Sequence, residues 1–136
     1  MASHGPEVPT RIEQRGVFID VVINHPNRAL AGIKARGLID TGSDHVLISR
    51  SIAKTLKLRH VGDEDLGAIG GMTVSGALHS GVVQVPHLRF ERLLPLYAVD
   101  WDQLSHSVLL GRSFLKHFVF RYDGPSDVFR FSQPID

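Results

Sequence analysis

Hydrophobic and polar residues alternate along several short segments of the chain, which is the pattern of β-strands with one buried face. Residues 17–23 are mostly β-branched or aromatic and end at the turn-forming residues 24–27. Residues 28–39 alternate again and finish with the apolar pair Leu38 and Ile39. Because the two segments are joined by a short turn, they predict an antiparallel hairpin.

Further apolar runs predict additional strands, at residues 81–86, 93–99, 108–110, 118–122 and 128–131. Pro86 and Pro95 favour strand ends or sheet edges, because proline lacks a backbone donor. Residues 49–58 predict a helix with Ser49 or Ser51 as its N-cap, and a second short helix follows Gly111. The expected fold class is therefore all-β, with one or two short helices.

The composition is that of an ordinary globular chain of one domain. It has 136 residues, of which 43% are hydrophobic and 21% charged. Residues 1–12 lack an apolar stretch and predict a flexible N-terminal arm, so the single domain is expected at 13–133. With no secretory signal and no membrane-spanning segment, we expect a cytoplasmic protein or a domain excised from a longer precursor.

Several classes of chemistry are disfavoured by what the sequence lacks. There is no cysteine, which excludes thiolate nucleophiles, disulfides and cysteine-based metal sites. The net charge is +1 without a basic run, which argues against nucleic-acid and anionic-membrane partners. The eight histidines form no metal-binding spacing, although His45 beside Asp44 is of interest. No phosphate or dinucleotide loop is present, so neither a metal nor a cofactor is expected.

The strongest chemical signal is Asp40-Thr41-Gly42-Ser43, directly after a strand that ends in apolar residues. A carboxylate at the end of a buried strand is costly unless it is hydrogen-bonded or functional. The threonine hydroxyl can hold the turn, and Gly42 allows backbone amides to approach the carboxylate. An Asx-type turn that merely ends the strand is the alternative explanation of these four residues.

Three segments in this order resemble the retropepsin-like (clan AA) aspartic proteases of the single-domain cellular and bacterial type. They are Leu38-Ile39-Asp40-Thr41-Gly42-Ser43, the hairpin Ile69-Gly70-Gly71-Met72, and Leu109-Leu110-Gly111-Arg112. The resemblance extends from Val17 to Phe131. It implies a closed β-barrel with a flap hairpin, assembled as a homodimer without a cofactor.

The resemblance also assigns roles to particular residues. Asp40 would be catalytic, supported by Thr41, Gly42 and Ser43. Asp44 and Arg112 would pair and position the substrate, although a purely structural brace is the alternative. The flap would comprise Ile69, Gly70, Gly71 and Met72, while the psi-loop and subsite would comprise Leu109, Leu110 and Gly111. For the apolar members of these sets, ordinary core packing is the alternative.

Two features depart from the viral members of the family. The helix at 49–58 is longer than the corresponding viral segment, and a C-terminal hairpin extends to Phe131. The four-stranded terminal sheet of the viral dimers is therefore not expected to carry over unchanged.

The chain contains a single Asp-Thr-Gly, whereas hydrolysis by carboxylates needs one group as base and another as acid. We therefore expect Asp40 to meet Asp40 of a second copy on a two-fold axis, in an endopeptidase that acts on extended peptides. The alternative is a weakly active or inactive module for dimerisation or peptide binding. We also hypothesise that the Ser43 hydroxyl donates to Asp40 and favours activity at acidic pH.

Overall fold

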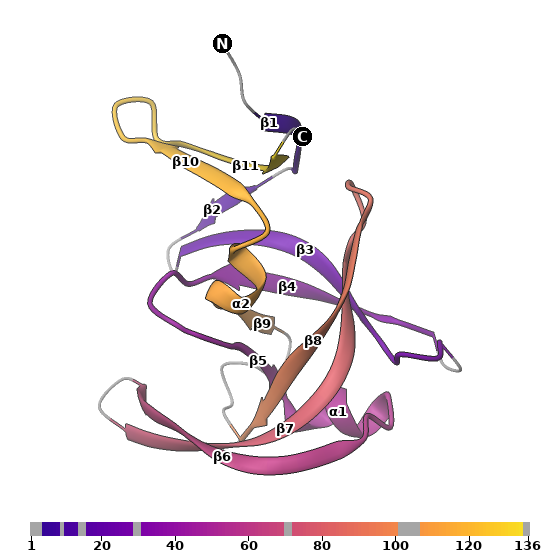
Figure 1. The fold of residues 1–136 in the computed structure, drawn as a ribbon. Coiled ribbons are helices and arrows are strands. Elements are labelled where there is room, and N and C mark those ends of the chain that lie inside the picture. The colour runs from indigo at the N-terminus through magenta and orange to yellow at the C-terminus, as the bar shows by residue number, and fades with distance from the viewer. Residues whose placement is uncertain are drawn as a thin grey trace.

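The computed structural model describes residues 4–8, 10–13, 16–28, 31–69, 72–100 and 107–134. It is built almost entirely from strands, with two short helices (Figure 1). In chain order the elements are β1 (His4–Val8), β2 (Arg11–Glu13), β3 (Gly16–Asn24), β4 (Ile33–Ile39), β5 (Val46–Ser49), α1 (Arg50–Thr55), β6 (His60–Ile69), β7 (Met72–Val85), β8 (Phe90–Val99), β9 (Ser107–Leu110), α2 (Arg112–Leu115), β10 (Val119–Asp123) and β11 (Val128–Pro134).

The larger sheet closes into a barrel. Its strand order is β2-β3-β4-β9-β5-β8-β7-β6, and an additional pairing joins β3 to β7. The strands from β3 round to β7 therefore form a ring, while β6 continues beyond it as the outer strand of a long hairpin with β7 (Figure 1). The all-β class and the antiparallel pairing of β3 with β4 confirm the sequence predictions.

The arrangement of β4, β9 and β5 positions the candidate site. β9 lies between the other two strands, parallel to β4 and antiparallel to β5. Ile39 is paired with Leu110, so the segments that follow β4 and β9 leave the sheet side by side. The chain thereby brings Asp40 and Gly111 together although they are far apart in the sequence.

Two apolar clusters form the interior. The main cluster fills the barrel and includes Ile19, Val21 and Ile23, which alternate with outward-facing residues along β3. The second apolar cluster consists of Leu47, Tyr97, Val99 and Leu109, with Leu66 and Leu78 packed against it. All four residues of β5 are buried, because its two faces contribute to different clusters.

α1 is shorter than the helix predicted at 49–58, and α2 follows Gly111 as predicted. Ser49 is confirmed as the N-cap of α1, since its Oγ accepts from the backbone N–H of Ile52 at 3.3 Å. α1 ends in a Schellman motif, in which Lys57 N–H donates to Lys54 O and Leu58 N–H donates to Ala53 O. Leu56 and Leu58, which follow Thr55, are therefore buried from the terminating turn and not from a longer helix.

The N-terminal segment, for which the sequence predicts a flexible arm, contributes two strands among the described residues. β2 pairs with β3, and β1 joins β11 and β10 in a separate three-stranded sheet. An extended segment with few apolar residues gains backbone hydrogen bonds in this way, at a sheet edge that is otherwise open.

Pro95 lies within β8 rather than at its end, opposite Ser80 of β7. The pairing of β8 with β5 begins only at Leu96. β8 therefore has a sheet edge at Pro95, where the missing N–H is tolerated.

Across the described residues, no helix has the length and apolar character needed to span a membrane.

Candidate active site

Asp40 begins the loop between β4 and β5 and is held by backbone groups. Its own N–H donates to Leu110 O at 3.1 Å, and its carboxylate Oδ1 accepts from Gly42 N–H at 2.9 Å. Ser43 N–H donates to Asp40 O at 3.2 Å, which closes a tight turn. The carboxylate is half-buried and so remains accessible at the surface of the barrel.

A second loop, after β9, lies directly against the first. Arg112 N–H donates to Ser43 O at 2.8 Å, and Ser113 N–H donates to Asp44 O at 3.1 Å. A β-carbon on Gly111 would stand 2.1 Å from the carbonyl oxygen of His45 and 2.6 Å from that of Ser43. Only glycine fits between these backbones, which explains the residue type at position 111.

Arg112 and Asp44, paired in the sequence prediction, are in contact. The guanidinium Nη2 donates to Asp44 Oδ1, and Nη1 donates to Thr41 O at 2.6 Å. The two side chains are 53% and 67% exposed, so the ion pair contributes little to stability by itself. The planar guanidinium instead ties the start and the end of the Asp40 loop together.

The Ser43 hydroxyl is engaged within its own loop, contrary to the hypothesis that it donates to Asp40. It donates to His45 O at 3.1 Å and accepts from His45 N–H at 3.3 Å. A hydroxyl has a single proton to donate, and here it is donated to the backbone carbonyl of His45. The donor to the carboxylate is the Gly42 amide instead.

The hairpin of β6 and β7 contains the predicted flap segment. Ile69 is paired with Met72, on either side of Gly70 and Gly71 in the sequence. These two glycines lie outside the described residues, and the side chains of Ile69 and Met72 are likewise outside the description. Closer to the barrel, Leu66 and Leu78 of the same hairpin pack against the second apolar cluster.

The predicted subsite residues divide between the two clusters. Leu109 is buried in the second apolar cluster beneath the hairpin, whereas Leu110 is fully buried in the main core. The psi-loop position of both residues follows from β9 lying between β4 and β5. Core packing is therefore the observed role of Leu110.

Beside Leu109 lie Tyr97 and its hydrogen-bond partner Glu64, two residues with no functional signal in the sequence. The Tyr97 hydroxyl donates to Glu64 Oε2 at 2.6 Å, and the His45 ring lies 4.5 Å from the Tyr97 ring, centroid to centroid. The hydrogen bond to Glu64, together with burial and the negative charge of Glu64, raises the pKa of Tyr97 to about 12. These residues come from β6, β8 and the loop before β5, so only the fold brings them together.

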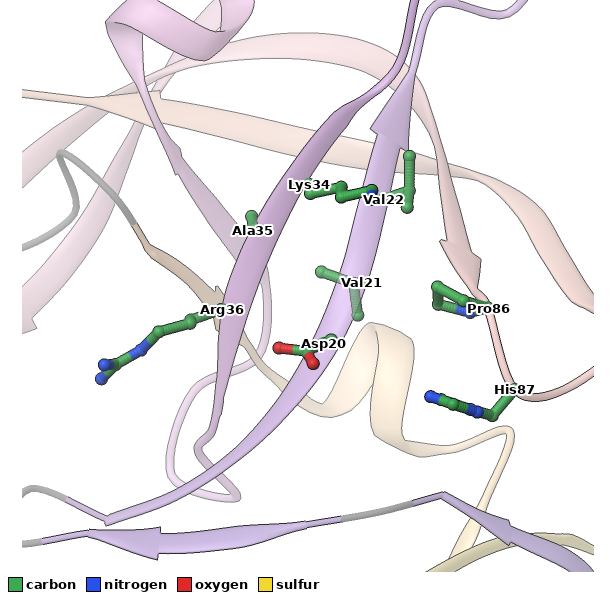
Figure 2. A pocket seen from close by; sticks show the side chains of 8 residues that line it. All are labelled: Asp20, Val21, Val22, Lys34, Ala35, Arg36, Pro86 and His87. Carbon is green, nitrogen blue, oxygen red and sulfur yellow. The ribbon is translucent and has the colours of Figure 1, made fainter.

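One hollow lies beside the Asp40 loop, and another lies away from it. One, of about 340 Å³, is lined by Thr41, Arg112, Leu115, Lys116 and Phe120, next to the Asp40 loop. The other, of about 420 Å³, lies between β3, β4 and the turn after β7, where Figure 2 shows Pro86 and His87 across from β3. None of the predicted site residues lines the second hollow.

In the described part of the chain, no group of three or more histidine, aspartate or glutamate side chains is placed to hold a metal ion. The Asp40 loop itself presents a positioned carboxylate, a backbone amide that bonds it and the Arg112 guanidinium.

Comparison with known proteins agrees with this geometry. Residues 27–117 match the family model of the gag-polyprotein putative aspartyl protease. Among curated proteins, none matches the sequence significantly.

Two solved structures have a similar fold. A retropepsin-like aspartic protease from Rickettsia conorii is 20% identical, with a TM-score of 0.57, over 100% of this chain and 98% of that one. The EIAV protease, complexed with the inhibitor HBY-793, is 20% identical, with a TM-score of 0.54, over 80% and 86% of the two chains. These matches confirm the retropepsin-like fold expected from the sequence. The chain therefore belongs to the gag-polyprotein putative aspartyl protease family.

Proposed function

We propose that the protein is an aspartic endopeptidase whose catalytic dyad combines Asp40 of one chain with Asp40 of a second copy. The observation that carries the proposal is the Asp40 loop itself. Its carboxylate is accessible, accepts from the Gly42 amide, and stands where the chains of β4 and β9 converge. A loop with this many hydrogen bonds holds a reacting group in a fixed geometry.

In the proposed mechanism one carboxylate of the dyad is ionised and the other is protonated, because two adjacent carboxylates do not both ionise. The ionised group accepts a proton from water, which attacks the peptide carbonyl carbon. The protonated group donates to the carbonyl oxygen, and a proton then passes to the leaving amine as the carbon–nitrogen bond breaks. The pair titrates as a unit.

The hollow beside Thr41 supports a second copy at this position. A dyad on a two-fold axis brings the surroundings of Asp40 into an isologous interface. Thr41 and Phe120 line an apolar hollow there, and the outer edge of β10 pairs with no strand among the described residues. We propose that the second copy covers both features. The pairing of β1 with β11 of its own chain supports a dimer sheet different from the viral one.

The substrate in this proposal is an extended peptide lying between the β6–β7 hairpin and the barrel. The second apolar cluster, which contains Leu47 and Leu109, lies beneath this hairpin. Arg112 and Asp44 would hold the peptide backbone beside the dyad, since an arginine–carboxylate pair has a fixed planar geometry.

The test is the substitution Asp40→Asn, which keeps the shape of the side chain but removes its acid–base chemistry. We expect cleavage of a peptide library to fall by at least about 10³-fold, because a catalytic group is lost. Sedimentation should show the same dimer as the wild type. The matched control is Glu91→Gln, which makes the same change from acid to amide at an exposed carboxylate. Glu91 pairs with Arg28 and does not belong to the Asp40 loop.

Equal cleavage by wild type and Asp40→Asn would contradict the proposal. If neither protein cleaves any peptide but both form the dimer, the chain is a dimerisation or peptide-binding module instead.

A further inference from the structure

The exposed side of α1 carries an unusual concentration of positive charge. Arg50, Lys54 and Lys57 follow one another at spacings of four and three residues, which places them along one side of the helix and its terminal turn. Together they line a hollow of about 260 Å³, whose remaining walls are Ala53, Leu58, His79 and Ala98. The hollow thus has a cationic rim and a mainly apolar floor.

The charges of this rim are only partly compensated. Arg50 Nε lies 3.1 Å from Asp100 Oδ2, and Asp100 is 85% exposed. In the part of the chain that the structure describes, Lys54 and Lys57 have no carboxylate within ion-pair distance. Among the described residues, three cations against one carboxylate leave two positive charges around the hollow. Like charges this close repel, and a doubly charged anion would relieve the repulsion.

The backbone at Lys57 gives an independent indication. Its φ is 53°, in the left-handed region, at the position of the Schellman motif where glycine is usual. A lysine there sacrifices backbone stability that glycine would supply. Strained non-glycine residues of this kind concentrate at functional sites. What the lysine adds in exchange is an ammonium group at the rim of the hollow.

The inner wall is formed by a buried histidine. His79 is 9% exposed, and its Nδ1 lies 3.2 Å from Leu58 O, the carbonyl of the residue after Lys57. This contact fixes the imidazole plane relative to the terminal turn of α1. His79 and the turn at Lys57 and Leu58 are therefore joined by a hydrogen bond.

We propose that this hollow binds a phosphate-type anion, either free phosphate or the phosphoryl group of a small molecule. Phosphate carries about −1.5 to −2 charges at neutral pH, which matches the two uncompensated cations. The arginine fork and two lysine ammonium groups supply the donors that such oxygens accept from. The volume suits a small oxyanion better than a segment of folded protein. The site is separate from the Asp40 loop and does not depend on the proposed protease activity.

The proposal is tested by amide NMR titration of the whole chain with sodium phosphate, at constant ionic strength, with sodium chloride as the blank. We expect saturable shifts at residues 53–58 and at His79. Lys57→Gly and Lys54→Gln should each weaken binding by about five- to tenfold, as expected for losing a charge-assisted contact. Lys34→Gln, the same change of charge on β4, should leave the affinity within about twofold, and Lys57→Arg should retain binding.

Lys57→Gly separates an anion-binding role from a structural one. We expect this variant to melt at a higher temperature than the wild type while binding phosphate more weakly, since the backbone strain and the ammonium are lost together. Titration with O-phosphoserine then distinguishes a phosphoryl group from free phosphate as the preferred form, and either preference supports the site.

Two results would overturn the proposal. In the first, Lys34→Gln weakens phosphate binding as much as Lys57→Gly does, which would mean diffuse surface charge rather than a site. In the second, a glutamate tetrapeptide binds at residues 53–58 more tightly than phosphate, which would mean that the hollow selects carboxylates.

Discussion

The Asp40 loop and the β6–β7 hairpin both border the second apolar cluster, yet they are held in different ways. The loop is tied to the chain after β9 by backbone hydrogen bonds, including those from Asp40 to Leu110 and from Arg112 to Ser43. Among the described residues, β7 pairs with β8 only from Ala77 onward, so the outer part of the hairpin is held to the barrel by side chains, namely the packing of Leu66 and the Tyr97–Glu64 hydrogen bond. The backbone hydrogen bonds hold the loop in one position, whereas side-chain contacts can break and re-form.

In the proposed endopeptidase, this difference would separate two functions within one small domain. Chemistry requires a carboxylate held to within a fraction of an ångström, which a backbone-bonded loop provides. Admission of a peptide requires an element that opens at modest cost, and such elements have few ties to the rest of the fold. The following predictions test whether the loop and the hairpin differ in this manner.

The largest effect is expected from Gly111→Ala. The new methyl group would overlap the carbonyl oxygens of His45 and Ser43, which are backbone atoms and cannot rotate away. We expect a loss of about 2–4 kcal/mol in the free energy of unfolding, measured by urea denaturation. Gly62→Ala is the matched control, because no atom lies within 4 Å of its β-carbon position. Equal losses in the two variants would show that the junction of the loops is not rigid.

A smaller effect is expected from Tyr97→Phe, which removes the hydroxyl that reaches Glu64. One hydrogen bond to a charged group is lost, so we expect a loss of about 1–2 kcal/mol. Hydrogen exchange should speed up mainly at the amides of β6 and β7, whereas the amides of the Asp40 loop should be unaffected. Faster exchange at residues 40–44 instead would contradict the separation of the two regions.

The same tyrosine predicts a dependence on alkaline pH. Its pKa is about 12 in the folded chain, against an ordinary value of 10.0, because the protonated hydroxyl donates to Glu64. Since the pKa is raised on folding, the stabilisation is complete below pH 10 and is lost as the pH rises through 12. Absorbance titration of the two tyrosines checks this. Tyr97→Phe should remove the transition near 12, while Tyr122→Phe should leave it in place.

The smallest effect is expected from Ser43→Ala. The hydroxyl bonds only the backbone of His45 within the loop, so its loss should cost about 0.5–1.5 kcal/mol. The pH–rate profile should not move, because the donor to the Asp40 carboxylate is Gly42 N–H. Ser75→Ala, an exposed serine of β7, serves as the control for removal of a hydroxyl. A shift of the acidic limb in Ser43→Ala alone would restore a role for this hydroxyl at the carboxylate.

Much of the site could be predicted because its signals are local. Asp40, Gly42 and Gly111 lie in short motifs whose residue types are dictated by the turn in which each stands. Arg112 and Asp44 were paired by resemblance, and their side chains are in contact. Tyr97 and Glu64 could not be predicted, because they lie 33 residues apart and no periodic pattern connects a strand to the hairpin that covers it.

The sequence by itself determined strands β3, β4 and β8 to β11, narrowed the N-cap of α1 to Ser49 or Ser51, and placed the Asp-Thr-Gly turn. Hydrophobic period, capping and turn chemistry act over a few residues. Only the tertiary structure decided where the N-terminal segment pairs, which partner the Ser43 hydroxyl takes and which side of α1 borders a hollow. These outcomes depend on which sheet edges and polar groups remain unpaired once the barrel has closed. That competition is settled by the whole fold rather than by neighbouring residues.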